Sequence, residues 1–244
     1  MWQCRLLLLL AIAAGLVSCE SESEANRNRF DNAARVSDAA TAGGTGSSST
    51  STAEAVELLA ARSAGYLDYG WAGMDTSTTM LVRVINRTER EWLVEIESGT
   101  KLEPSSANVQ SMVVTEEVEV HMHPHESHDF EVQVACLDIS KPPPAGNDFG
   151  WTAEVSPRLN QFIACVKQIL EQIAGTMDAD TAARVRRSLP NFLQIALWQA
   201  RGATEDQWVE FFIHYQKMDP VAARQAAATF EQIGRYVVQE CPSI

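Results

Sequence analysis

Basic residues are scarce in this chain: 19 Lys and Arg stand against 32 Asp and Glu, which gives a formal net charge of −13. Contacts between basic side chains and phosphates provide most of the affinity of proteins for DNA and RNA. The charge balance therefore argues against a nucleic-acid partner, and it also disfavours attraction to anionic lipid headgroups. The one dense basic run, Arg184-Val185-Arg186-Arg187, is short, and we expect it to lie on the solvated side of a helix.

Catalytic motifs are missing as well. The sequence contains no phosphate-binding glycine loop, no G-x-S-x-G, no H-E-x-x-H and no G-x-G-x-x-G. Its many carboxylates give no acid–base pair that stands out, because strands and helices both place acidic side chains on their solvated faces. We therefore predict a protein that is not an enzyme, and a hydrolase of cell wall or glycan has no motif in its favour.

No apolar run is long enough to span a bilayer, which takes about 20 residues. The run Leu6 to Val17 follows Arg5 and ends at small residues, an order typical of a secretory signal peptide. Its end, Leu16-Val17-Ser18-Cys19, resembles the lipobox of bacterial lipoproteins. The resemblance implies that Cys19 becomes the first residue of the mature chain and carries a diacylglyceryl thioether and an N-acyl chain such as palmitate. An ordinary cleaved signal that happens to end in cysteine is the alternative.

A lipid on Cys19 would determine where the protein resides. One acyl chain gives only reversible membrane binding, whereas two or three hold durably. Glu20 stands where lipoproteins retained in the inner membrane have Asp. We therefore expect an exported protein held at the cell membrane by its lipid anchor, with the outer membrane favoured if the source is Gram-negative; a source with a single membrane is left open.

Large aliphatic and aromatic residues are nearly absent from residues 21–52, which are rich in Ser, Thr, Gly and Ala. Such a segment buries too little surface to offset chain entropy, so we predict a disordered tether with a reach on the order of 30 Å. The rest of the chain is long enough for one sizeable domain or two small ones. The predicted organisation is a signal peptide at 1–18, a tether at 19–52, a β-sandwich at 53–140, a linker at 141–155 and a helical bundle at 156–244.

Alternating patterns predict strands in the first half of the folded part. Val118 to Met122 and Phe130 to Val134 alternate apolar and polar residues, which is typical of strands with one solvated face. Met80 to Ile85 is apolar at every position except Arg83, and so predicts a strand largely buried on both faces. Six or so short strands separated by turns favour an antiparallel immunoglobulin-like β-sandwich. A short helix is expected at 53–61, and the strands at 66–71, 79–85, 91–97, 111–114, 117–123 and 129–134.

After the break at Lys141-Pro142-Pro143-Pro144 the apolar pattern takes the period of a helix. Ser156 and Pro157 form an N-cap followed by proline at the first helical position. Thr204 and Gln207 form a capping box. The predicted fold class is therefore α+β, with an α-helical bundle after the β-sandwich. Helices are expected at 156–175, 178–188 and 191–201, and two more begin after the caps at 204 and 219.

Four of the five histidines lie within eight residues, His121-Met122-His123-Pro124-His125-Glu126-Ser127-His128. His121 and His123 would point to one face of a strand, about 7 Å apart, and His125 and His128 would lie in the turn that follows. Neutral imidazole is a preferred ligand of zinc, nickel and copper, so three of these rings could converge on one ion. The alternatives are a zinc or nickel site at this hairpin, or a solvated hairpin that holds no cofactor.

Five cysteines are present, of which Cys4 lies in the signal and Cys19 is the expected lipidation site. An exported protein can form disulfides, and the other three cysteines leave one over. Cys165 lies at the edge of the first bundle helix and Cys241 just after the last, so we predict a disulfide between them. Cys136 would then be the cysteine outside the bridge.

Residues 136–198 contain Cys136-Leu137-Asp138, then Lys141-Pro142, a helix, and Gln194-Ile195-Ala196-Leu197-Trp198. This order resembles that of the motifs in the thioester domains of bacterial surface adhesins. Those domains join a cysteine to a glutamine side chain and capture nucleophiles on host surfaces, so the resemblance implies Cys136 and Gln194 as the bonded pair. The chain departs from the family pattern at Ala135, where an aromatic is common, and at Leu193, where threonine is expected. A helix in which this glutamine and tryptophan have structural roles is the alternative.

These features favour a non-catalytic lipoprotein of the cell envelope. Its folded part would be a binding or interaction module on a flexible stalk, and its partner another envelope protein or a surface ligand. Two alternatives stay open: a covalent surface adhesin that uses Cys136 and Gln194, and a metal-binding envelope protein that uses the four clustered histidines.

Overall fold

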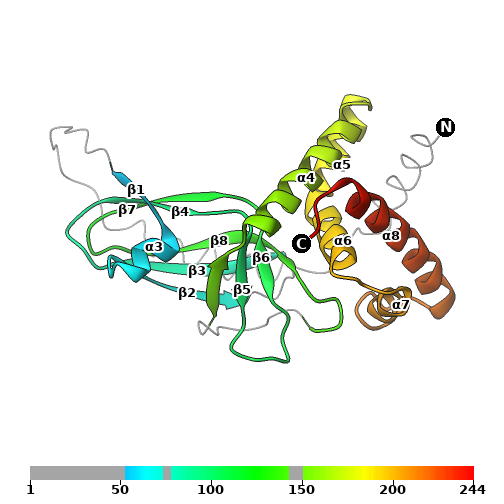
Figure 1. Cartoon of the computed structure of the whole chain (residues 1–244), viewed down its shortest axis with the longest axis horizontal. Helices are drawn as coiled ribbons and strands as arrows, with labels where there is room; N and C mark the ends of the chain where they lie inside the picture. Colours follow the sequence, from blue (N-terminus) through cyan, green and yellow to red (C-terminus); the bar gives the residue numbers. More distant parts are fainter. Residues whose placement is uncertain (1–52, 74–77, 143–150) are drawn as a thin grey trace, which may run out of the picture.

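The computed structural model describes residues 53–73, 78–142 and 151–244. The predicted signal peptide, the lipidation site Cys19 and the whole of the predicted tether lie outside the described residues. Within these ranges the chain has a mixed α+β fold, in which most strands come first and most helices last (Figure 1). None of the helices in the described ranges is long and apolar enough to cross a membrane.

The strands form two sheets. The larger sheet has the order β2-β3-β8-β6-β5-β9 with every pairing antiparallel, and the smaller has the order β1-β4-β7 with β1 parallel to β4. Figure 1 shows β4 and β7 in a layer above β8, β3 and β2. The strands are β1 (Glu54–Glu57), β2 (Leu67–Gly73), β3 (Thr79–Asn86), β4 (Trp92–Ile96), β5 (Thr100–Glu103), β6 (Met112–Val114), β7 (Val118–Met122), β8 (Ser127–Cys136) and β9 (Thr152–Val155).

Alternation decides which side chains of these strands are buried. On β3, Met80, Val82 and Val84 are fully buried, and the residues between them are half-buried or exposed. The second face of β3 is thus half-buried apart from Arg83, less buried than the face that carries Met80, Val82 and Val84. The second face is partly solvated because Arg83 forms an ion pair there with Asp129 on β8, at 2.5 Å.

Three strands, β1, β5 and β9, lie where the sequence predicted none, and β5 falls between the strands predicted at 91–97 and 111–114. Strand β9 falls within the predicted linker at 141–155 and pairs with β5. Strand β1 occupies the first part of the predicted helix at 53–61, so helix α3 (Leu58–Ser63) begins later. All three strands are only four residues long, and β1 and β9 owe their hydrogen bonds to partners far along the chain, which a local pattern does not reveal.

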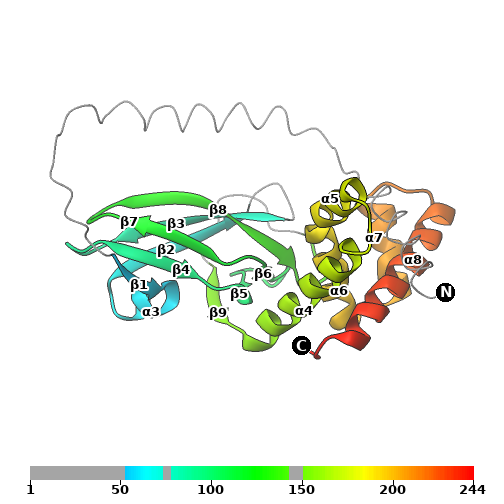
Figure 2. The same cartoon turned by 90° about the horizontal axis from the view of Figure 1, so that it is seen from above.

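Five helices follow β9, and Figure 2 shows them gathered at the end of the sheets opposite to α3 and β1. The predicted N-caps are present: the Ser156 hydroxyl accepts from the Leu159 N–H, and Thr204 and Gln207 form the capping box. Asp219 caps the last helix by accepting from two backbone N–H groups. The helices are α4 (Pro157–Ala174), α5 (Ala179–Arg187), α6 (Leu189–Ala200), α7 (Glu205–His214) and α8 (Pro220–Glu240).

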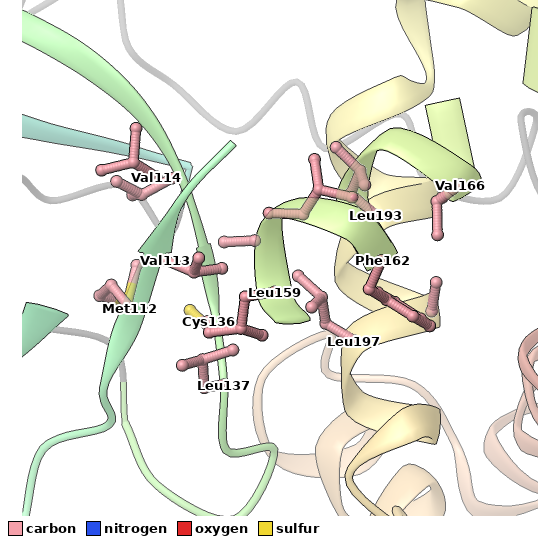
Figure 3. Close-up of a cluster of buried hydrophobic side chains, with 14 of the residues drawn as sticks. Met112, Val113, Val114, Cys136, Leu137, Leu159, Phe162, Val166, Leu193 and Leu197 are labelled. Carbon is pink, nitrogen blue, oxygen red and sulfur yellow. The ribbon is translucent and has the colours of Figure 1, made fainter. Parts of the chain in front are cut away.

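The helices and the larger sheet share one apolar core. Figure 3 shows side chains of β6 and β8 facing side chains of α4 and α6. Gly99 fixes the start of α4 against the sheet: its φ is +85°, and a Cβ there would lie 2.6 Å from the backbone nitrogen of Asn160. Any larger residue at this position would push α4 away from β5. The labelled members of the core at this joint are Met112, Val113, Val114, Cys136, Leu137, Leu159, Phe162, Val166, Leu193 and Leu197.

A disulfide joins Cys165 on α4 to Cys241, the residue after α8, as the sequence predicted. The bridge spans 76 residues of sequence and so closes the whole helical region. Closing a loop of this length removes conformations from the unfolded chain, which stabilises the fold by about 4 kcal/mol in the chain-entropy model. Cys136 lies outside this bridge and is buried.

Candidate functional site

Cys136 is the last residue of β8 and lies where the sheet meets the helices (Figure 3). It pairs with Met112 on β6 and has no exposed surface. Burial disfavours the charged thiolate and raises the pKa of the Cys136 thiol to about 12, against a smaller opposite effect of the nearby Gln110 side chain. At neutral pH the sulfur is therefore held as a thiol.

The side chain of Gln194, on α6, reaches the backbone of Cys136 with both ends of its amide. The Cys136 N–H donates to Gln194 Oε1 at 2.7 Å, and Gln194 Nε2 donates to the Cys136 carbonyl at 2.6 Å. Residues 136 and 194 are the pair that the thioester resemblance implies, and the structure brings them into direct contact. The contact runs through the Cys136 backbone, and Cys136 remains a thiol.

The path of the strands explains why the backbone of Cys136 requires a hydrogen-bond partner from α6. The ladder between β3 and β8 ends near Gln133, with a last bond from the Val134 N–H to the Thr78 carbonyl. On the opposite edge, the Leu137 N–H donates to the carbonyl of Ser111, the residue before β6. The N–H and carbonyl of Cys136 therefore point to an edge where no strand continues, and the Gln194 amide takes the place of a strand.

A second glutamine, Gln110, lies on the other side of Cys136 and is only 2% exposed. Its Oε1 accepts from the Asp138 N–H at 3.3 Å, and its Nε2 donates to the Lys141 carbonyl at 3.2 Å. Its backbone N–H donates to the Pro142 carbonyl at 3.2 Å. Gln110 thus binds the segment that follows Cys136 at three points.

The sequence did not identify Gln110 as a site residue. It stands outside every motif that was recognised, and nothing local distinguishes it from other polar residues before a strand. Its contacts exist only because the chain after β8 turns back over the start of β6.

The segment after Cys136 is also held by Asp138. Its carboxylate accepts from the Ser140 N–H at 3.0 Å and the Ser140 hydroxyl at 2.6 Å, and Lys141 Nζ lies 3.5 Å away. Partial burial disfavours the charged carboxylate, but these hydrogen bonds and the Lys141 ammonium together hold the pKa of Asp138 below its usual range. Asp138, part of the motif that resembles the thioester family, thus has a structural role in this turn.

The chemistry open to this arrangement is acyl transfer. A buried thiol and a half-buried carboxamide belong to two residues that are in contact across the joint. Attack of the sulfur on Cδ of Gln194, with loss of ammonia, would give a thioester between the two side chains. The Cys136 thiol and the Gln194 amide as they stand are the two reactants of that step.

The four clustered histidines lie at the other end of the sheets, where β7 turns into β8. His121 and His123 lie on one face, as predicted, with ring centroids 4.9 Å apart. Both face Glu91: His121 Nε2 is 3.8 Å and His123 Nδ1 3.3 Å from its carboxylate oxygens. Both rings are largely exposed to solvent.

The other two histidines face different carboxylates. His125 Nε2 is 2.9 Å from Glu89, and His128 Nδ1 is 3.6 Å from Glu126. Three rings do not converge on one point, and in the ranges the structure covers no three His, Cys, Asp or Glu side chains are arranged to hold a metal ion. Zinc or nickel binding by these histidines stays a prediction from the sequence.

Comparison with known proteins gives no relative from which a function could be transferred. No protein-family model, curated protein or solved structure matches the chain. The function therefore has to be inferred from the residues and their geometry.

Proposed function

We propose that this protein is a membrane-anchored lipoprotein of the cell envelope, whose folded part is a non-catalytic binding module that captures its partner covalently through a thioester between Cys136 and Gln194. The partner is an envelope or surface protein that presents a nucleophile. Each chain would act once, because capture consumes the thioester. We also infer that the two sheets are an immunoglobulin-like sandwich and that α4 to α8 form a bundle packed on its end.

One observation carries the covalent part of this proposal: the Gln194 amide contacts Cys136 across the joint between sheet and helices. The two residues are 58 positions apart in sequence, and the resemblance of short motifs to the thioester family pairs the same two residues independently of this contact. A fold that places this pair in contact provides the proximity that thioester formation requires.

A second candidate is a binding module without a covalent step, in which Gln194 only holds α6 against the larger sheet. It is favoured by the same hydrogen bonds, because both ends of the amide already satisfy the Cys136 backbone. The burial of the Cys136 thiol also favours it, since a buried cysteine packs as a small apolar residue. In this case the partner binds elsewhere on the surface.

The membrane anchor is proposed from the sequence alone, on the lipobox-like residues that end at Cys19. The anchor places the module at the envelope, with the outer membrane favoured if the source is Gram-negative. The acidic balance of the chain is consistent with a protein partner rather than a nucleic acid.

Intact mass spectrometry separates the two candidates. The sample is the mature chain with Cys19→Ser, produced without its signal in an oxidising compartment. If Cys136 and Gln194 are condensed, the mass is lower than that of the reduced, unmodified chain by two hydrogens and one ammonia. If Gln194 only forms hydrogen bonds with Cys136, the mass is lower by two hydrogens, from the bridge between Cys165 and Cys241.

Two variants serve as controls for this measurement. Cys136→Ala and Gln194→Ala should each abolish the ammonia deficit and keep the loss of two hydrogens. Treatment with methylamine should add the mass of one methylamine to the unsubstituted chain and to neither variant. A deficit that persists in Gln194→Ala would mean that another glutamine reacts, and would refute the proposed pair.

A further inference from the structure

The two hydrogen bonds between Gln194 and Cys136 involve the atoms that a thioester reaction changes. Oε1 of Gln194 is the oxygen that becomes negatively charged when Cδ is attacked, and Nε2 is the nitrogen that leaves as ammonia. The Cys136 N–H donates to Oε1 at 2.7 Å, and Nε2 donates to the Cys136 carbonyl at 2.6 Å. The backbone of Cys136 therefore binds both the oxygen on which charge develops and the leaving group.

Formation of the thioester affects these two bonds differently. The Cys136 N–H can still donate to the thioester oxygen, because that bond closes a ring as small as the one in a γ-turn. The thioester has no N–H, so the Cys136 carbonyl loses its donor when ammonia leaves. A buried carbonyl without a partner is unfavourable, and Cys136 is fully buried. The place of the departed ammonia is therefore a binding position for another N–H group.

We propose that the Cys136 carbonyl binds the nucleophile that opens the thioester, and that it thereby selects a primary amine, such as a lysine side chain of the partner. This inference rests on the proposed function. Ammonia leaves from a position beside the Cys136 carbonyl, and by microscopic reversibility an attacking amine enters through the same position. A nucleophile held in this way reacts faster, because its orientation is set before the attack.

The step balances as follows on these atoms. The lone pair of the amine attacks Cδ of Gln194, and the π electron pair of the carbonyl moves to Oε1, which accepts from the Cys136 N–H. A donor already aimed at this oxygen lowers the barrier. The carbonyl re-forms as the Cδ–Sγ bond breaks, with its electron pair going to Sγ. One proton of the amine ends on Sγ, so the products are an amide between Gln194 and the partner, and the Cys136 thiol.

The selection for a primary amine follows from the number of hydrogens on the attacking atom. One hydrogen is released to Sγ, and a second is needed to hold the Cys136 carbonyl throughout the step. A primary amine has both. A secondary amine has one, and so has the hydroxyl group of serine, threonine or a sugar. The reactive group of the partner is therefore a lysine side chain or an N-terminal amine rather than a hydroxyl.

The test compares the rates at which three amines are incorporated into the mature chain with Cys19→Ser, followed by intact mass. Ethylamine and dimethylamine are isomers of nearly equal basicity, but ethylamine is primary and dimethylamine secondary. Isopropylamine is the matched control for size, because it is primary and bulkier than dimethylamine. A small alkyl thioester in solution, treated with the same three amines, gives their reactivity without the protein.

We expect dimethylamine to react about tenfold or more slowly than ethylamine, after each rate is divided by that for the free thioester. Isopropylamine should react at a rate close to that of ethylamine. A dimethylamine rate equal to that of ethylamine would overturn the role of the Cys136 carbonyl. An isopropylamine rate as low as that of dimethylamine would also overturn it, because bulk alone would then explain the difference.

The outcomes also distinguish this inference from the proposed function. A chain without the ammonia deficit overturns both. A deficit together with either of the two contrary rate patterns overturns the selection of primary amines alone. All three amines are tested on one and the same chain, so differences in folding between variants do not enter the comparison.

Discussion

The amide of Gln194 completes the backbone hydrogen bonding of Cys136 at the place where β3 no longer accompanies β8. A side chain of a helix thereby forms the two hydrogen bonds that a neighbouring strand would otherwise form with this residue. This contact links α6 to the larger sheet at a buried position, so it bears on stability whether or not the two side chains are covalently joined.

Loss of this contact should be costly. Gln194→Ala leaves a buried N–H and a buried carbonyl of Cys136 without partners, which we expect to lower the free energy of unfolding by about 3 kcal/mol. The measurement is urea unfolding in a Cys136→Ala background, where the backbone contact remains and no thioester can form. Gln199→Ala, which loses two longer bonds of 3.4 Å on the same helix, should cost much less. Equal losses in the two variants would contradict a special role for Gln194.

The sequence was most informative where structure is decided locally. Helix caps at Ser156 and Thr204 were predicted because a cap depends on residues within one turn of the helix. Strands β7 and β8 were predicted from alternation that their own residues carry. Strand β9 was missed because its bonds come from β5, about fifty residues earlier in the chain.

The sequence predicted only part of the candidate site. Cys136 and Gln194 were named through a motif resemblance, and their contact could not be derived from spacing or periodicity. Gln110 could not be named at all, because its contacts with Asp138 and Lys141 are made by tertiary structure. The role of a buried polar residue depends on which groups the fold places next to it. A single sequence does not show which groups those are.

The disulfide should contribute strongly to the stability of the helical region. Replacement of Cys165 and Cys241 by serine restores conformations to the unfolded chain, and we expect a loss of about 4 kcal/mol in the free energy of unfolding. Both cysteines are replaced so that neither can form a bridge with Cys136. Reduction of the unsubstituted protein should give the same shift in the urea midpoint. An unchanged midpoint in both experiments would show that the unfolded chain is already restricted.

The ion pair between Arg83 and Asp129 should make a small contribution that depends on pH. Two hydrogen bonds of 2.6 and 2.5 Å from the Arg83 guanidinium lower the pKa of Asp129, against a smaller effect of partial burial. A depressed folded-state pKa stabilises the fold fully above the unfolded value of about 3.9, and the contribution is lost as pH falls through the folded pKa.

The size of that contribution is limited by solvent, because the two side chains are 48% and 39% exposed. We expect Asp129→Asn to lower the free energy of unfolding by roughly 0.5 kcal/mol at neutral pH, less at high salt, and not at all below the folded pKa. Urea midpoints measured across this pH range provide the test. A difference that grows on acidification would have the wrong sign for this pair.

The lipid anchor is tested in the source cell or a bacterial host. Cys19→Ala removes the only thiol of the lipobox-like segment, so the variant should take up no label from an alkyne fatty acid and should leave the membrane fraction. Cys4→Ala is the matched control, because it removes a cysteine from the predicted signal peptide and should leave the label unchanged. Equal label on Cys19→Ala and the unsubstituted chain would refute lipidation at this residue. Labelled protein that fractionates with the inner membrane would instead preserve the anchor and exclude the outer-membrane location inferred from Glu20, because lipidation and sorting depend on different residues.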